Sequence, residues 1–437
     1  MKLVSLAAFL LMIFTMQTVS QTPAELAEIW EKERVSNKFP SNTRHKDLLV
    51  YLDGLKKLGL DVREVGRSYD DRSIHQVQFG RGPLKVFMWS QMHGDEPTAT
   101  PALIDMFTVL QTNRDKAWVK AIEEKLTIRA VPMLNPDGAE LFIRRNKQGI
   151  DINRDALDLK TPEAQLLKRL RDEWQPEVGF NLHNQNALTA AGPTDKQAAI
   201  SLLVVYGDEK KTESEGHERN KHVAAAMVLA LRQFIPGYIG RYGDDWTPTA
   251  FGDNFSAWGT PTILIETGAL HGRDEMFLVK MNFVAFLTAL KTFADGSHNG
   301  FDPNVYVSLP NNSSRRLMNV IFRQAMIIDP TKPDTFAASD LGINFERRRQ
   351  EFSTPGFIRR TGDLNDVTGL DEYDASGFFV VGRLQAVKTG NLSELLFYKK
   401  DRKIDWKAAD IEKEYPPDAI FSLGKWIHGE GIVKKIR

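Results

Sequence analysis

The chain has 437 residues, of which 42% are hydrophobic and 26% charged, a composition typical of a globular protein long enough for two or three domains. Lysine plus arginine and aspartate plus glutamate each number 57, so no strong overall charge favours nucleic acid or an anionic membrane as a partner. There is no cysteine, which excludes disulfides and thiolate metal sites and leaves His, Asp and Glu as possible metal ligands.

The first 20 residues have the pattern of a secretory signal peptide. Lys2 precedes an apolar stretch over residues 3–16, and the small residues Thr18 and Ser20 precede Gln21. The alternative, an uncleaved anchor, fits less well because this stretch is short for a membrane span. We predict an exported protein, periplasmic or extracellular, with no integral membrane segment after removal of the signal and no nucleic-acid partner.

Residues 22–60 have helical patterns, and strand and helix signals alternate from residue 74 onward. The strand-like runs are IHQVQFG (74–80), LKVFMWS (84–90), LTIRAVPML (126–134), EVGFNLH (177–183), ISLLVVYG (200–207) and TPTILIETG (260–268). The helix-like runs cover 98–111, 161–174, 217–234 and 273–294. Apolar strands that alternate with helices predict an α/β fold with a mixed, mostly parallel sheet covered by helices on both faces. We assign this domain to residues 21–297.

The turn-rich segment ADGSHNGFDPN (294–304) predicts a domain boundary. Beyond it, short strand-like runs predict a smaller, β-rich accessory domain over residues 298–437. They are VYVSLP (305–310), RLMNVIFRQAMII (316–328), GFFVVGRLQAV (377–387) and ELLFYKK (394–400). We interpret their aromatic clusters as sheet core rather than as a ligand surface.

Histidines and a carboxylate follow two of the apolar strands, at the strand end where open α/β sheets form their sites. His93 and Glu96 follow LKVFMWS at a spacing that allows both side chains to bind one metal ion. A loop histidine next to a glutamate in the first turn of a helix would have the same pattern. His183 ends EVGFNLH and is either a third ligand or a strand-end histidine bonded to its neighbours. Three protein ligands would leave a fourth zinc position open, as in catalytic sites.

Two further segments carry polar groups beside apolar strands. Residues 135–156, NPDGAELFIRRNKQGIDINRDA, combine Arg144 and Arg154 with several amides, which suggests recognition of a carboxylate, a group that arginine binds in bidentate fashion. A salt-bridged surface loop is the alternative. Glu266 directly follows the apolar run TILI, and a buried carboxylate there needs a function, such as that of a general base, or a salt-bridge partner.

Five segments in order resemble the signatures of the zinc metallocarboxypeptidase family: HGDEP, NPDG, RRN…GIDINRD, NLHNQN and ILIETG. The upstream segment GRSYDDRSIHQVQFG is also similar to that family, and the resemblance extends over about residues 45 to 295. It implies the carboxypeptidase A-like fold, and an exported bacterial member fits the signal peptide and the missing cysteines. It also implies one Zn²⁺ ion bound by His93, Glu96 and His183.

The same resemblance implies roles for the remaining residues. Asp151 would orient the first histidine ligand, and Arg144 would polarise the scissile carbonyl. Asn153 and Arg154 would hold the terminal carboxylate of the substrate, and Glu266 would be the general base for a metal-activated water. The expected activity is hydrolysis of a C-terminal peptide bond in a peptide or peptide-like substrate with a free carboxylate.

The chain departs from the family pattern where relatives carry a mobile tyrosine. The segment most similar to the one that carries the tyrosine is Asp-Trp-Thr-Pro (245–248), in which Pro248 cannot supply a phenol. Tyr242 lies close in sequence but outside the aligned position. Asp253 falls in the region that lines the side-chain pocket in relatives. If it faces that pocket, basic or diamino-acid residues would be favoured.

Two alternative functions remain open at this point. One is a zinc amidase or deacylase on the same scaffold, including a peptidase for cell-wall stem peptides; it would not require a free terminal carboxylate. The other is a non-catalytic binding protein, which predicts loss of a ligand or of the base, whereas all three ligands and Glu266 are present.

Overall fold

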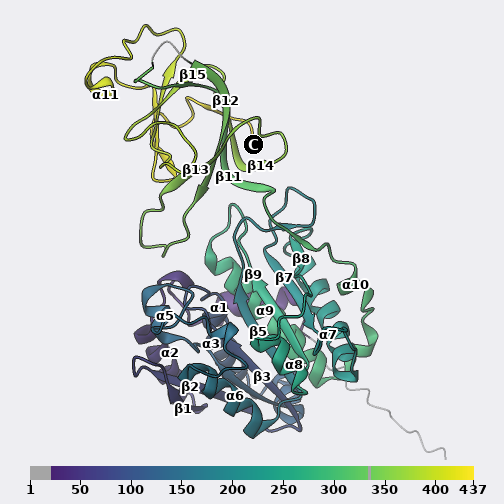
Figure 1. The fold of residues 1–437 in the computed structure, drawn as a ribbon. Helices are drawn as coiled ribbons and strands as arrows, with labels where there is room; N and C mark the ends of the chain where they lie inside the picture. The colour runs from purple at the N-terminus through teal and green to yellow at the C-terminus, as the bar shows by residue number, and fades with distance from the viewer. Residues whose placement is uncertain (1–20, 333–335) are drawn as a thin grey trace, which may run out of the picture.

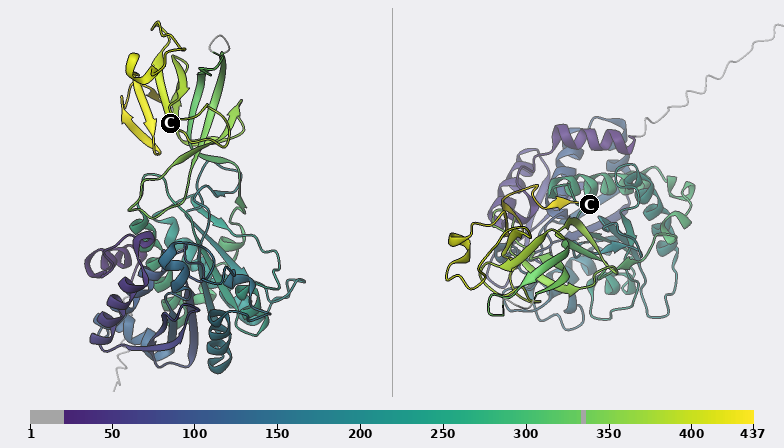
Figure 2. Two further views of the ribbon diagram at one scale, coloured as in Figure 1. Left: turned by 60° about the vertical axis from the view of Figure 1, so that its left-hand side comes forward. Right: turned by 90° about the horizontal axis from the view of Figure 1, so that it is seen from above.

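The computed structural model describes residues 21–332 and 336–437, which form two large sheets and a small two-stranded one (Figure 1). The signal peptide predicted for residues 1–20 lies outside these ranges. The first large sheet has eight strands and carries helices, and the second has nine strands. The second stands at one end of the first domain in Figure 1 and in the left view of Figure 2, and it overlaps that domain when seen from above. The predicted fold class, an α/β domain followed by a β-rich one, is confirmed.

Parallel neighbours occupy the middle of the first sheet. Its strand order is β1 (Asp61–Arg67), β2 (Ser73–Gly80), β4 (Leu126–Val131), β3 (Leu84–Ser90), β5 (Val178–Asn184), β9 (Thr262–Thr267), β7 (Ile200–Val205) and β8 (Ile239–Arg241). Strands β4, β3, β5 and β9 run parallel to one another, as do β7 and β8. Strands β1, β2 and β4 pair antiparallel, as do β9 and β7, so the sheet is mixed.

Helices cover both faces of this sheet because its central strands are apolar on both sides. In β3, Val86 and Met88 belong to the core on one face, and Phe87 and Trp89 belong to the core on the other. The first face packs under α1 (Pro23–Glu33), α2 (His45–Lys57), α3 (Ala99–Thr112), α4 (Ala117–Lys125), α7 (Glu215–Arg232) and α9 (Glu275–Ala294). The second face packs under α6 (Pro162–Trp174) and α8 (Phe251–Ala257).

Helix α9 is long and apolar enough to cross a membrane by length and composition, and 78% of its apolar window is buried inside the protein. It packs against α1, α3, α4 and α7. Its apolar surface is therefore accounted for by the core of the first domain.

Some elements differ from the sequence-based expectation. Strands β1 and β8 were not predicted, because β1 is a polar edge strand in which only Val62 is buried and β8 has three residues. The strand predicted over 305–310 is wrong: α10 (Asn304–Val307) forms there and buries Tyr306, whose hydroxyl accepts a 2.8 Å hydrogen bond from the Val204 amide. Tertiary contact with β7 overrides the β-branched pattern.

The chain stays against the first domain past the predicted boundary at residue 297. After η3 (Ser297–Gly300) and α10, the short strand β10 (Asn312–Ser313) pairs with β6 (Ala190–Ala191). The second sheet begins four residues later, at Leu317.

The second sheet is built around aromatic side chains. Its strands are β11 (Leu317–Ile328), β12 (Phe336–Phe345), β13 (Gly356–Gly362), β14 (Thr368–Asp374), β15 (Phe378–Gly382), β16 (Leu395–Lys399), β17 (Ala419–Ser422), β18 (Lys425–His428) and β19 (Lys434–Lys435), with one short helix, α11 (Ile411–Glu414). Phe322 of β11 lies 5.0 Å from Phe397 and 5.6 Å from Trp426, measured between ring centroids. Most residues of the clusters GFFVV and LFYKK are buried here, so the prediction that they form sheet core is confirmed.

Candidate metal centre and active site

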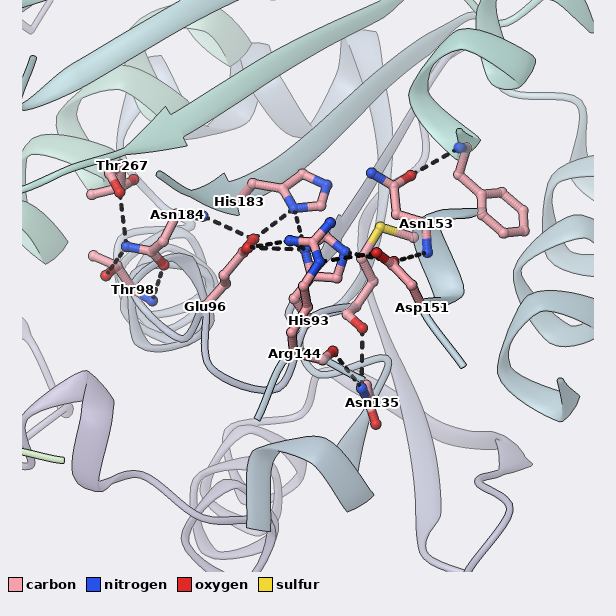
Figure 3. A network of polar contacts seen from close by, with 12 residues as sticks. His93, Glu96, Thr98, Asn135, Arg144, Asp151, Asn153, His183, Asn184 and Thr267 are labelled. Carbon is pink, nitrogen blue, oxygen red and sulfur yellow. Dashed lines mark hydrogen bonds and ion pairs between the residues drawn. The ribbon is translucent and has the colours of Figure 1, made fainter. Parts of the chain in front are cut away.

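The four parallel strands β4, β3, β5 and β9 end at the same edge of the first sheet, and the predicted site residues follow them there. His93 and Glu96 follow β3, and Arg144, Asp151, Asn153 and Arg154 lie in the segment after β4. His183 and Glu266 lie at the ends of β5 and β9. The structure thus brings together side chains that are up to 173 residues apart in sequence, from position 93 to position 266. Figure 3 shows the part of this group that includes His93, Glu96 and His183.

The turn after β3 depends on a close approach of two backbones. A Cβ atom on Gly94 would lie 1.9 Å from the carbonyl carbon of Gly138, so only glycine fits. Gln91 holds the turn from the other side, because its side-chain amide donates a 3.0 Å hydrogen bond to the Gly94 carbonyl. This turn directs His93 and Glu96 toward the end of β5.

Three ligand atoms of His93, Glu96 and His183 lie within 4.8 Å of one another. The Nδ1 atom of His93 is 2.9 Å from Glu96 Oε1, and His183 Nδ1 is 2.7 Å from Glu96 Oε2. The two Nδ1 atoms are 3.2 Å apart. All three residues are buried.

The charges of this cluster depend on one another. Burial raises the pKa of the Glu96 carboxyl, but the charges of His93 and His183 outweigh burial and hold that pKa well below its usual range. Burial lowers the pKa of His183. Burial acts in the same direction on His93, but Glu96 and Asp151 raise its pKa above the ordinary value.

This donor set fits a divalent cation. Asp151 Oδ1 lies 3.0 Å from His93 Nε2. Burial raises the pKa of the Asp151 carboxyl, but His93 and Arg144 outweigh burial and hold that pKa below its usual range. The ionised carboxylate can only accept a hydrogen bond. In neutral His93 the proton is therefore on Nε2, which leaves the Nδ1 lone pair facing His183 Nδ1 at 3.2 Å. Imidazole nitrogens of two histidines, here His93 and His183, beside a carboxylate oxygen of Glu96 are ligands that zinc prefers.

Arg144 lies against the same cluster. Its Nε donates to Asp151 Oδ2 over 2.9 Å, and its Nη1 lies 3.2 Å from Glu96 Oε1. About 42% of its side chain is exposed, and it lines the cleft above the ligands. Its positive charge thus faces the space where a substrate would lie.

Asn135, the first residue of NPDG, holds this region together without facing the cleft. Its Oδ1 caps α5 (Pro136–Leu141) by accepting from the Gly138 amide over 2.8 Å. Its Nδ2 donates to the carbonyl of Met92 over 3.1 Å and to that of Arg144 over 3.4 Å (Figure 3). The side chain therefore connects the loop before His93 with the segment that carries Arg144, a positioning role that the motif alone did not show.

The segment after β4 ends in the 3-10 turn η2 (Ile152–Arg154), which presents Asn153 and Arg154. The amide oxygen of Asn153 accepts from the Phe251 backbone over 2.9 Å, and among residues 21–332 and 336–437 nothing bonds its amide nitrogen. Arg154 is exposed and donates to its neighbour's carbonyl over 2.7 Å. Both side chains keep donors free toward the cleft.

Glu266 is buried beside the ligands. It pairs with His183 in the register of β5 and β9, so both side chains project from the same face of the sheet. It is 7% exposed, and no group in the described part of the chain bonds its carboxylate. Burial, followed by the charge of Glu96, raises the pKa of Glu266 well above the usual range, and Arg144 and Arg347 oppose this effect. A buried carboxylate without a partner is typical of a functional site.

A cavity of about 120 Å³ adjoins Glu266 and is lined by Asn153, Arg154, Asp253 and Tyr242. One oxygen of Asp253 accepts from the Thr247 amide over 2.9 Å. Burial, then the charges of Glu266 and Glu96, raise the pKa of Tyr242 to about 12. Pro248 does not line this cavity, whereas the phenols of Tyr206 and Tyr242 both do, and Tyr242 also lines the larger cleft over the ligands.

A larger cleft of about 820 Å³ opens over the ligands, and its far wall belongs to the second domain. This wall includes Phe345, Glu346, Arg347 and Arg359. Sequence reasoning missed these residues; the run ERRRQ at 346–350 was a visible charge signal, but nothing in the sequence placed it beside His93.

The fold and the His93–Glu96–His183 set define an α/β domain with a candidate metal site. Residues 51–245, somewhat less than half of the chain, match the model of the family described as zinc carboxypeptidase. Carboxypeptidase 2 of Trichophyton rubrum is 30% identical over 110 residues, which is 25% of this chain and 20% of that protein. Carboxypeptidase 2 of Trichophyton tonsurans is 29% identical over the same shares. The match therefore spans about a fifth of the length of these relatives.

The solved structures that match this chain include a metallo-carboxypeptidase from Burkholderia cenocepacia, with a TM-score of 0.47 and 16% identity over 57% of this chain and 69% of that one. The carboxypeptidase A from Helicoverpa armigera has a TM-score of 0.47 and 15% identity over 63% of this chain and 80% of that one.

Proposed function

We propose that the protein is a zinc metallocarboxypeptidase that hydrolyses the C-terminal peptide bond of substrates with a free carboxylate. The observation that carries this proposal is Glu266, a buried carboxylate that no group in the described part of the chain bonds, held beside the His93–Glu96–His183 set. We further propose that one zinc ion binds to that set. The family match and the nitrogen and oxygen donors support this choice of metal.

Zinc at this position supplies Lewis acidity, which polarises a carbonyl and acidifies water. In our proposal Glu266 takes a proton from the attacking water and then returns it to the leaving amine. Its pKa, which burial raises well above the usual range, supports this role because the carboxylate then takes up a proton more readily than an ordinary glutamate. Arg144 donates a hydrogen bond to the oxyanion that develops on the scissile carbonyl.

Asn153 and Arg154 supply the recognition of chain ends in this proposal. Their free donors face the cavity next to Glu266 and would pair with the terminal carboxylate of the substrate. Asp253 lines the same cavity, so we propose a preference for basic or diamino-acid side chains at the terminus. Tyr242 lies where its phenol can donate to the bound residue.

The proposal is tested with peptide pairs that differ only in a free or an amidated C-terminus, assayed with the zinc-loaded protein. Loss of the terminal charge leaves Arg154 without its partner, so we expect kcat/KM to fall on the order of a hundredfold or more. Equal cleavage of both forms would instead support an amidase or deacylase. A free-terminus series ending in Lys, Arg or Leu tests the role of Asp253.

Replacing Asp151 with asparagine should weaken metal binding. The change keeps the shape but removes the charge that fixes the His93 tautomer, and loss of such an outer partner typically costs about 10–100-fold in metal affinity. Competition with a fluorescent zinc chelator measures this affinity. Asp158→Asn, an exposed aspartate that pairs with Lys160, is the matched control and should bind zinc as the unmodified protein does. Unchanged affinity in Asp151→Asn would contradict the assignment.

We also propose that the protein is exported. This rests on the signal-peptide pattern of residues 1–20 alone, and N-terminal sequencing of the mature protein tests it.

A further inference from the structure

The second domain contributes one wall of the cleft above the ligands. Of the side chains on that wall, Arg347 lies in the loop between β12 and β13, and Arg359 lies on β13. The opposite wall carries His93, Glu96 and Arg144. A substrate that reaches the ligands therefore contacts both domains.

The loop that carries Arg347 is fixed to the first domain by the arginine two positions further on. Arg349 is 5% exposed and donates to the carbonyls of Ser41, Ala139 and Glu140 over 2.9, 2.6 and 2.9 Å. Ala139 and Glu140 belong to α5, directly before the segment that carries Arg144. The loop is thus attached to the same helix from which the catalytic segment starts.

Further contacts confirm this attachment. The Glu351 carboxylate accepts from Arg44 over 2.6 Å, and the Gln350 amide donates to Ser41 Oγ over 3.1 Å. The guanidinium carbons of Arg347 and Arg349 lie 5.8 and 5.3 Å from the ring centre of Phe142. Arg347 is therefore held at the rim of the cleft by a buried, multiply bonded neighbour.

The two arginines that line the cleft differ from the arginines next to them. Arg348 pairs with Glu346 over 2.7 Å and Arg360 pairs with Asp366 over 2.8 Å. Within residues 21–332 and 336–437, Arg347 and Arg359 form no ion pair, and both are exposed. The second-domain wall therefore presents two guanidinium groups that form no ion pair in the described residues, while Glu346 beside them is paired. Arg347 also acts electrostatically on the carboxyl groups of Asp95 and Glu266, which line the same cleft.

The direction of the substrate follows from the two cavities, which share Asn153, Arg154, His183, Tyr242 and Glu266. If the terminal residue occupies the smaller cavity, the chain before the scissile bond passes over the ligands into the larger cleft. There it meets the two unpaired guanidinium groups.

We infer that Arg347 and Arg359 form a binding site for carboxylate side chains upstream of the cleaved bond, so that the preferred substrates are acidic peptides with a C-terminal residue to be removed. This inference rests on the proposed carboxypeptidase function for the direction of the chain. Arginine suits the role because its planar donors pair with carboxylates in bidentate fashion.

The test compares peptides that carry Glu or Gln at one of the three positions before the scissile bond, all with the same free terminus. With the zinc-loaded full chain we expect kcat/KM to favour Glu by about fivefold in at least one position, and the preference to fall at high salt. Arg347→Ala combined with Arg359→Ala should reduce the ratio to about one. Arg348→Ala, which removes the neighbouring paired arginine, should leave it unchanged.

A ratio of one in the unmodified protein at all three positions, or a preference that persists in the double variant, would overturn the inference. Binding of fluorescent Glu and Gln peptides to the zinc-loaded Glu266→Gln variant gives a second readout that needs no turnover. If the Glu peptide binds more tightly than the Gln peptide, and this difference requires Arg347, but the unmodified protein shows no turnover, only the proposed function is contradicted. Turnover without any Glu preference would contradict this inference alone.

Discussion

Glu266→Gln is expected to abolish nearly all turnover while zinc binding and folding persist. The amide has the size of the carboxylate but cannot take a proton, and loss of a general base typically costs about 10²–10⁴-fold in rate. Because no described group bonds the Glu266 carboxylate, the replacement breaks no hydrogen bond in the protein and removes a buried ionisable group. Steady-state kinetics, zinc content and the melting temperature of the same preparation are the measurements.

The control for this variant is Glu209→Gln, an exposed glutamate that lines neither cavity of the site and should keep full activity. The pH profile gives a further readout. A base must be deprotonated, so activity is lost as the pH falls through the raised pKa of Glu266, and this acid limb should lie above the ordinary glutamate range. Near-normal rates in Glu266→Gln would refute the base assignment.

His93→Ala is expected to remove the metal and, with it, all measurable hydrolysis. Two ligands remain in place, but Asp151 then orients no imidazole, and Arg144 loses one of the groups it contacts. Loss of a direct ligand should weaken zinc binding by more than the roughly 10–100-fold typical of an outer partner. Elemental analysis after gel filtration should fall from about one zinc per chain to near zero.

His428→Ala is the matched control, since His428 is an exposed histidine of the second sheet and should leave zinc content unchanged. Chelator treatment of the unmodified protein should lower its melting temperature, because zinc that binds only the folded state stabilises it, and His93→Ala should show no such shift. Stoichiometric zinc in His93→Ala would contradict the ligand assignment.

Much of the first domain could be predicted from hydrophobic periodicity. The runs at 84–90, 177–183 and 260–268 are apolar on both faces, as central strands must be when helices cover both sides of the sheet, and they form β3, β5 and β9. The edge strand β1 carries charged residues at alternating and adjacent positions and has no such pattern. Residues 305–310 have the composition of a strand, but a helix forms over Asn304–Val307 because Tyr306 is buried there and bonds to β7.

The candidate site was predictable to the extent that its residues directly follow apolar strands. His93, Glu96, His183 and Glu266 stand at strand ends, and the chemistry of imidazole and carboxylate groups indicates a metal without reference to coordinates. Asn135 was not recognised as a positioning residue, because its partners Met92 and Arg144 lie on either side of it in loops whose contact no local pattern encodes.

The sequence by itself determined the alternation of strands and helices, the kinds of ligand available and the residue types at strand ends, because these depend on local periodicity and side-chain chemistry. Only the tertiary structure decided that Arg347 and Arg359 face the ligands across a cleft. That outcome depends on Arg349, whose hydrogen bonds to Ser41, Ala139 and Glu140 join positions 209 to 308 residues apart. Contacts over such separations follow from how two folded domains pack, and the hydrophobic pattern of neither domain specifies them.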